Sequence, residues 1–408
     1  MTRGSLIAPL LATPRGPAPR RGAGLGDVEA IADAALVWDD EGIITFAGPA
    51  AAAPPVDAPA RVGGAVVPGF VDCHTHLPFI GWRADEFEAR LAGVSYRDLH
   101  GEGGIYRSAA LLSGASDDEV LAFSASLAGE MAAHGTTAVE LKTGYGLSVD
   151  AELRQARLAR RLAETIPQTA TVTLLACHAV PHGTSRQDWV RAVLEELLPT
   201  AAVEGLVDAV DVYVEDIAFG VDDFRRVAEA AAGLGLAVRC HADQLGGSGA
   251  AEAAAAVGAR NADHLNHVSA EGVAALGGGT TAAGLLPVAD QFTREPPPPV
   301  DQLIEAGAAL VLATDLNPGT CPCLSMPEVI SAAATLYRLS PSASLTAATL
   351  NAAWALGLDD RLGSLEVGKR ADFVVLDAED PAMIPYRPGH NPVRETWIGG
   401  LTVAPPSA

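Results

Sequence analysis

The sequence predicts an α/β protein, a (β/α)8 TIM-like barrel with a small β-sandwich formed by both chain ends. From residue 65 onward, eight apolar strand-like segments alternate with Ala-rich amphipathic segments. These strands are apolar almost throughout, which is typical of parallel strands buried on both faces. Both chain ends instead carry short strand patterns. A helical layer around a parallel sheet, with a β domain beside it, accounts for all three observations.

The central region from 65 to 362 supplies the barrel. A doubly wound open sheet is the alternative, but no GxGxxG motif follows the first strand, which weakens it. The connection Leu77–His134 is long enough for an extra loop and helix. The expected strands are Val66–Asp72, Thr136–Lys142, Ala170–Ala176, Ala209–Glu215, Leu236–Cys240, Asn261–His264, Thr280–Leu286 and Ala308–Thr314. The expected helices are Asp118–Ala133, Asp150–Glu164, Arg186–Leu198, Val221–Leu234 and Ser248–Val257.

Residues 1–64 and 363–408 form the predicted β-sandwich domain. Ala35–Gly48 reads as two short strands around an acidic turn. Ala371–Leu376 and Thr396–Val403 supply strand patterns near the other end. We expect the two ends to meet in one small domain beside the barrel.

The composition narrows the possible partners. A formal net charge of −23 leaves no basic stripe for phosphate contacts, which argues against nucleic acid and anionic membranes. The five cysteines are an odd number without a regular framework, which fits a reducing compartment. The apolar patch Met1–Ala12 is interrupted by Pro9, and no run is long enough to span a bilayer. We therefore expect a cytoplasmic protein.

Four potential metal ligands follow the predicted strands. His74 and His76 follow the first strand, His241 the fifth and Asp315 the eighth. Alone, an HxH pair is usually structural and a strand-ending Asp usually caps a helix. Together they stand at the carboxyl ends of strands, the face where barrel active sites lie. Three imidazoles and a carboxylate suit one divalent metal ion, Zn²⁺ first and iron as the alternative.

Further polar residues follow other strands and complete a plausible hydrolytic site. A bound metal lowers the pKa of water from ~15.7 toward ~7, which generates hydroxide at neutral pH. His264, after the sixth strand, is the candidate base, and Asp315 can carry the proton to the leaving nitrogen. Arg83, beyond the first strand, offers the bidentate fork that suits a carboxylate. We therefore expect a small anionic substrate.

Several segments carry a family resemblance. They resemble the amidohydrolase superfamily and, within it, the imidazolonepropionases, which hydrolyse the cyclic amide of 4-imidazolone-5-propionate to N-formimino-L-glutamate in histidine degradation. HxH alone indicates only the superfamily, whereas the KTGYGL and TDLNPGT segments are narrower signals. The segments are Pro68–Leu77, Asp85–Leu91, Glu140–Leu147, His241–Gln244, Ala262–Leu265 and Ala313–Thr320.

The resemblance implies a role for each matched residue. His264 would activate water, and Gln244, where some members have Glu, would orient substrate because an amide cannot act as a base. Lys142 would be a supporting residue, not a metal bridge, and a homodimer is implied. The metal ligands would be His74, His76, His241 and Asp315. The substrate contacts would be Arg83, Tyr145, His178, Asn317, Gly319 and Thr320.

Two alternatives remain open at this point. The same scaffold could host another cyclic amidohydrolase or a cyclic amidine deaminase, because fold alone does not determine the reaction. A binding protein that keeps the metal and has lost catalysis is the other alternative.

Overall fold

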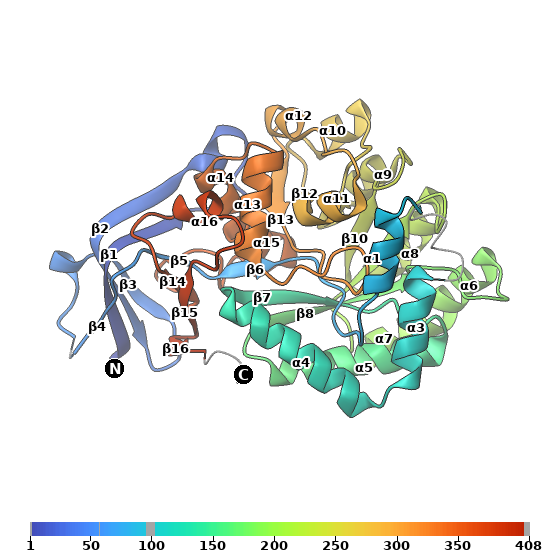
Figure 1. Cartoon of the computed structure of the whole chain (residues 1–408), viewed down its shortest axis with the longest axis horizontal. Helices are drawn as coiled ribbons and strands as arrows, with labels where there is room; N and C mark the ends of the chain where they lie inside the picture. The colour runs from blue at the N-terminus through green and yellow to red at the C-terminus, as the bar shows by residue number, and fades with distance from the viewer. Residues whose placement is uncertain (1, 57, 95–102, 404–408) are drawn as a thin grey trace.

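The computed structural model describes residues 2–56, 58–94 and 103–403. Residues 1, 57 and 404–408 of the predicted terminal domain, and 95–102 of the first long connection, lie outside the described residues. The chain forms two sheets, a parallel one surrounded by helices and a mostly antiparallel one built from both ends, seen on the left of Figure 1. The predicted fold class is confirmed.

The parallel sheet contains all eight expected strands in sequence order. Each described strand pairs with its sequence neighbour, from β6 through to β13. Nearly every strand residue is buried, as helices on the outside and side chains on the inside require. The strands are β6 (Phe70–Asp72), β7 (Thr136–Lys142), β8 (Thr169–Cys177), β9 (Ala209–Val214), β10 (Ala237–Ala242), β11 (Asn261–His264), β12 (Ala282–Leu285) and β13 (Ala309–Leu312).

The first and last strands meet just beyond their carboxyl ends. The Thr314 hydroxyl donates to Asp72 Oδ2 over 2.6 Å, and the Asp315 backbone N–H donates to the His74 carbonyl over 3.1 Å. The His76 N–H donates to the Leu316 carbonyl over 2.8 Å. This closure places two predicted histidine ligands directly beside the predicted aspartate ligand.

Helices cover the outside of the barrel (Figure 1). Ser116, Ser148 and Ser185 each cap a helix by accepting the N–H three residues on, at the starts of the helices expected from Asp118, Asp150 and Arg186. The helices are α1 (Ala84–Leu91), α3 (Gly104–Gly114), α4 (Asp117–Ala133), α5 (Val149–Thr165), α6 (Arg186–Ala192), α7 (Leu198–Val203), α8 (Val221–Gly233), α9 (Ala250–Val257), α10 (Ala270–Leu276), α11 (Pro287–Thr293), α12 (Val300–Glu305), α13 (Met326–Leu336), α14 (Pro341–Ala347), α15 (Leu350–Leu356) and α16 (Met383–Tyr386).

The two chain ends form one continuous sheet in the order β16-β15-β14-β5-β1-β2-β3, with β4 also paired to β1. The expected strand Val66–Asp72 divides at Gly69, where the chain leaves this sheet and enters the barrel. A Cβ at Gly69 would lie 2.2 Å from Thr137 Oγ1, so only glycine permits this close crossing. The strands are β1 (Thr2–Pro14), β2 (Val28–Asp39), β3 (Ile44–Pro49), β4 (Ala60–Arg61), β5 (Val66–Pro68), β14 (Phe373–Leu376), β15 (Val393–Ile398) and β16 (Leu401–Thr402).

Each sheet has its own apolar core. The larger core lies between the barrel strands and their helices, and the smaller one packs Trp38 and Phe373 on the terminal sheet. Within the part of the chain that the structure describes, no helix combines the length and apolar character needed to cross a membrane.

Candidate metal centre and active site

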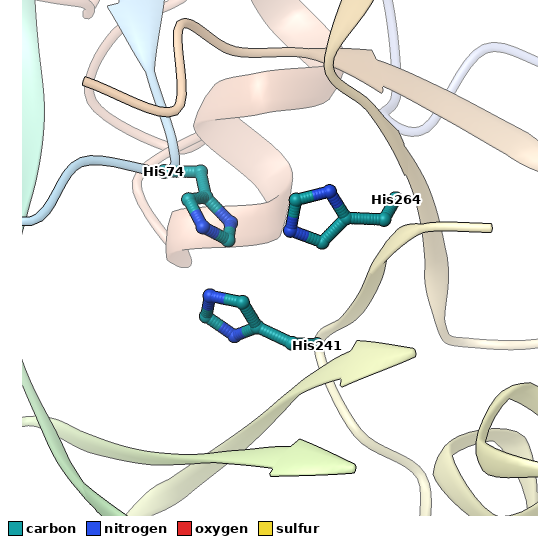
Figure 2. Close-up of side chains that lie close together, drawn as sticks. All are labelled: His74, His241 and His264. Carbon is teal, nitrogen blue, oxygen red and sulfur yellow. The ribbon is translucent and has the colours of Figure 1, made fainter. Parts of the chain in front are cut away.

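The four predicted metal ligands converge at the carboxyl end of the barrel, and all are buried. Asp315 Oδ1 lies 3.3 Å from His76 Nε2 and 3.6 Å from His74 Nε2. The rings of His74 and His241 are 4.5 Å apart between centroids. Two groups have ligand atoms close enough for one ion, His74 with His76 and Asp315, and His74 with His241 and His264. Figure 2 shows the latter three rings facing one another.

Two of these imidazoles are held so that their Nε2 atoms face the centre. His74 Nδ1 lies 2.7 Å from Asp263 Oδ2, and His241 Nδ1 lies 3.0 Å from Asp211 Oδ2. In both rings the buried Nε2 has no hydrogen-bond partner among the described residues. A carboxylate behind a histidine fixes the tautomer that leaves Nε2 free to ligate a metal. The donor set therefore fits a divalent metal ion.

A buried charged network supports Asp211, the carboxylate behind His241. Lys142 Nζ lies 2.7 Å from Asp211 and 2.8 Å from Glu140, and Arg239 Nε lies 2.8 Å from the other Glu140 oxygen. Lys142 belongs to neither potential metal group among the described residues. Lys142 instead contacts Asp211, and Asp211 in turn contacts the His241 ring.

The sequence reasoning did not identify Glu140, Asp211 or Arg239 as site residues. A signal for them exists, because side chains two apart on a strand share one face. Glu140 precedes Lys142 by two positions, and Arg239 precedes His241 by two. Charged residues two positions before a polar strand end therefore indicate a charged barrel interior beneath the site.

Burial and neighbouring charges determine the protonation of the site. Burial lowers the pKa of His264 to about 3, so its ring is neutral at pH 7. Burial raises the pKa of Asp315, but the hydrogen bond from His76 and the nearby imidazoles lower it by more. For Asp211, burial again opposes ionisation, and His241 and Lys142 outweigh it. Both carboxylates are therefore ionised, as metal ligation requires, and the neutral His264 ring can accept a proton.

The backbone is strained where two of these side chains enter the site. His264 and Leu265 have φ of 79° and 63°, and Asp315 has φ of 57°. Non-glycine residues rarely adopt this left-handed region, and such strain concentrates at functional sites. The Leu265 N–H donates to the Ala242 carbonyl over 3.0 Å, which helps hold the His264 turn in place.

The predicted substrate residues surround a small cavity next to the histidines. Its volume of about 30 Å³ is enough to hold water. Tyr213 and Ile105, which were not predicted, also line it. The predicted residues that line the cavity are His76, Arg83, Tyr145, His178, His241, Gln244, His264, Asp315, Asn317 and Thr320.

The loop after β7 is folded by side chains of α5. Gln155 Oε1 accepts the N–H groups of Gly144 and Tyr145, and Glu152 accepts those of Gly146 and Leu147. These bonds place the Tyr145 ring 5.4 Å from the His178 ring. The His178 ring in turn stacks on His76 at 5.2 Å. The KTGYGL segment is thus a loop that presents an aromatic side chain to the metal centre.

Arg83 is the buried cation of the cavity, with 3% of its surface exposed. Its Nε and Nη1 have no hydrogen-bond partner among the described residues, and Nε lies 3.5 Å from Glu86 in an ion pair. Buried guanidinium N–H groups without acceptors are costly. Both N–H groups are therefore potential hydrogen-bond donors to a ligand.

Asn317 organises the loop after β13. Its Oδ1 accepts the N–H groups of Gly319 and Thr320 over 3.0 and 2.7 Å, and its Nδ2 donates to the Asp315 carbonyl over 2.8 Å. Gly319 does not line the cavity itself. It lies directly against the Arg83 guanidinium.

Gln244 is positioned by Glu215, a residue that the sequence reasoning did not place in the site. The backbone N–H groups of Gln244 and Leu245 donate to Glu215 Oε1 over 2.6 and 2.8 Å. Burial raises the pKa of Glu215 to about 7. Glu215 directly follows β9. Because polar residues at the carboxyl ends of barrel strands face the site, its position in the sequence could have identified Glu215 as a site residue.

The sequence also matches known proteins. The model of the amidohydrolase family matches residues 65–403. The chain belongs to the amidohydrolase family. It is 43% identical over 385 residues to an imidazolonepropionase of Rubrobacter xylanophilus, with 92% of each chain covered. It is 45% identical over 376 residues to one of Methylobacterium sp., covering 91% of this chain and 93% of the relative.

Solved structures share the fold at low sequence identity. An adenosine deaminase from Xanthomonas campestris with bound zinc matches 98% of this chain and 92% of its own, with a TM-score of 0.71 and 22% identity. A guanine deaminase from C. acetobutylicum matches 98% of this chain and all of its own, with a TM-score of 0.71 and 14% identity. These matches support the barrel with its terminal sheet. Family membership and the imidazolonepropionase relatives together make the chain a hydrolase.

Proposed function

We propose that this chain hydrolyses 4-imidazolone-5-propionate to N-formimino-L-glutamate. The observation that carries the proposal is a buried arginine, Arg83, whose Nε and Nη1 have no hydrogen-bond partner among the described residues, in the same cavity as a histidine–aspartate cluster. A cyclic amide that bears a carboxylate needs both features. The imidazolonepropionase relatives, which align over nine-tenths of the chain, support the same reaction.

We assign one divalent ion to His74, His76, His241 and Asp315, with zinc as the expected metal and iron as the alternative. When bound, the ion supplies water activation at neutral pH and polarisation of the substrate carbonyl. Nitrogen and carboxylate donors of this kind suit both metals. The bound zinc of the adenosine deaminase neighbour supports the first choice.

His264 is the proposed base. Its neutral ring can accept the proton that water loses as its oxygen attacks the ring carbonyl carbon. The ionised Asp315 then takes the second proton from the attacking oxygen and passes it to the leaving nitrogen as the C–N bond of the cyclic amide breaks. The oxygen of the water ends in the new carboxylate, one of its protons ends on the formimino nitrogen, and His264 releases the other to solvent.

The remaining cavity residues would bind the substrate. Arg83 would hold the propionate through its bidentate fork, while Tyr145 and His178 would contact the imidazolone ring. Gln244 would orient the ring through its amide. Asn317, Gly319 and Thr320 would form the loop on the product side, with Asn317 acting through the loop conformation it maintains.

The cellular setting also remains a proposal. We expect a cytoplasmic homodimer that acts on a small anion and binds neither nucleic acid nor membranes. The net charge of −23 supports the last point. All five cysteines are free, and Cys73, Cys177 and Cys240 are buried behind the site histidines, which supports a reducing compartment.

The test is turnover by the purified, metal-loaded protein. We expect loss of the ultraviolet absorbance of 4-imidazolone-5-propionate and formation of N-formimino-L-glutamate. Ammonia release from an aminated heterocycle, with the imidazolone left intact, would instead identify a deaminase. Metal binding without turnover of either compound class would identify a non-catalytic homologue.

A further inference from the structure

Gly319 occupies a position where a side chain would collide with Arg83. A Cβ built at Gly319 would lie 2.0 Å from Arg83 Nη2, 2.3 Å from Nε and 2.4 Å from Cζ. These are well below any normal contact distance. The Arg83 guanidinium therefore fills the space that any other residue at position 319 would need.

Neighbouring contacts hold Gly319 in this place. The Arg83 N–H donates to the Pro318 carbonyl over 2.9 Å, so the backbones of the two loops are tied together. Arg90 Nη2 donates to the Gly319 carbonyl over 2.8 Å, and the Gly319 N–H donates to Asn317 Oδ1 over 3.0 Å. Because both its carbonyl and its N–H are engaged, Gly319 cannot retreat to make room for a side chain.

We propose that Gly319 is a specificity-determining residue that acts through Arg83. Its missing side chain lets the guanidinium lie directly against the loop after β13, where Arg83 lines the cavity. The site can then prefer carboxylate-bearing ligands over neutral ones with the same ring. The inference rests on the proposed function for the carboxylate that Arg83 receives.

An alanine at this position should displace the arginine without unfolding the protein. Gly319 does not have the positive φ that would strain an alanine. The colliding atoms belong to the far end of a flexible side chain, which can swing away at little cost. Gly246 is a matched control on the same rim, because a Cβ there would meet nothing within 4 Å.

The experiment compares two ligands with the same ring by calorimetry on the metal-loaded protein. The probes are 3-(imidazol-4-yl)propionate and 4-methylimidazole, which share the imidazole ring and differ in the carboxylate, so ring and metal contributions cancel in their affinity ratio. We expect the wild type and Gly246→Ala to favour the carboxylate roughly tenfold or more, as a charged hydrogen-bonded pair provides. Gly319→Ala should abolish most of that preference and leave 4-methylimidazole affinity and melting temperature near wild type.

The double variant separates an effect through Arg83 from a direct one. Arg83→Met should remove the preference, and Gly319→Ala added to Arg83→Met should change nothing further. If Gly319→Ala fails to fold, Arg90→Gln is the second variant to measure. It removes the hydrogen bond to the Gly319 carbonyl without adding an atom at position 319, and it should lower the preference for the carboxylate ligand in part. An unchanged ratio in Gly319→Ala, or in Arg90→Gln where that variant is needed, overturns the inference, as does a further drop in the double variant.

The outcomes also separate this inference from the proposed reaction. A protein that prefers the carboxylate ligand through Gly319 and Arg83, yet does not open the imidazolone ring, supports the inference and refutes the proposed function. A wild type that turns over the imidazolone but shows no preference between the two probes overturns the inference alone.

Discussion

The interior beneath the metal centre and the core of the terminal sheet are buried to the same degree but differ in chemistry. In the terminal sheet, Phe373 stacks on Trp397 at 5.2 Å and tilts against Trp38 at 5.6 Å between ring centroids. In the barrel, Glu140 and Lys142 lie in an ion-paired network with no exposed surface. The core of the terminal sheet is stabilised by burial of apolar surface, whereas the barrel interior is held together by ion pairs.

The two cores contribute differently to the stability of the fold and to the geometry of the site. Apolar burial is non-directional and stabilises any well-packed arrangement. Buried ion pairs lose much of their Coulomb energy to desolvation, but their fixed geometry orients the groups they hold. Changes in the terminal core should therefore affect unfolding, whereas changes in the barrel interior should affect metal binding and turnover.

The largest expected effect is on turnover. His264→Ala should lower kcat by roughly 10²–10⁴-fold because the proton acceptor is lost. His264 lies outside the proposed ligand set, so metal content by elemental analysis should stay at the wild-type level. His241→Ala is the matched variant and should lose the metal. Wild-type turnover in His264→Ala would refute the assigned base.

The next largest effect is expected on the stability of the terminal sheet. Trp38→Ala should destabilise the protein by about 3–5 kcal/mol through a cavity in the terminal core. Below its melting temperature the variant should keep the wild-type kcat/KM, because Trp38 lies outside the barrel interior. Denaturant unfolding measures the stability, and steady-state kinetics measure kcat/KM. A loss of kcat/KM that accompanies the loss of stability would show that the terminal core and the active site are not independent.

A smaller effect on metal affinity is expected from Asp211, which lies behind the proposed ligand His241. Asp211→Asn should weaken metal affinity by about 10–100-fold, because the His241 Nδ1–H loses its charged acceptor. Competition with a chromophoric chelator measures the affinity. The matched variant Asp208→Asn removes an exposed carboxylate that pairs with Arg160, and it should leave the affinity unchanged.

The smallest expected effect lies at the junction of the two regions. Burial lowers the pKa of His134, which ends α4 next to the terminal sheet. The unfolded state therefore binds this proton more readily, and the stability of the wild type falls as pH drops below the usual histidine pKa of ~6.5. His134→Gln should remove this loss, by less than about 1 kcal/mol between pH 8 and 5 because the site is partly exposed. Thermal unfolding of both proteins across that range measures it.

The sequence predicted the barrel well because parallel strands read as apolar runs that end in polar residues. His74, His241, His264 and Asp315 stood out because each interrupts such a run at its carboxyl end. Strand β1 was missed, since Thr2–Pro14 contains Pro9 and gains its order from long-range pairing with β2.

Other features depended on tertiary contacts that no local pattern encodes. The division at Gly69 follows from the approach of Thr137, which lies far along the chain. The contact between Gly319 and Arg83 joins residues 236 positions apart, counted as 319 minus 83. Motif reasoning could assign both residues to substrate binding, but only the fold shows that one makes room for the other.

One divalent metal ion, held by three histidines and an aspartate, should act with the neutral His264 to open the cyclic amide. Turnover of 4-imidazolone-5-propionate by metal-free protein titrated with zinc measures this requirement. We predict that activity rises linearly and stops at one ion per chain. Full activity without metal, or a rise that continues to two ions per chain, would refute a single catalytic ion.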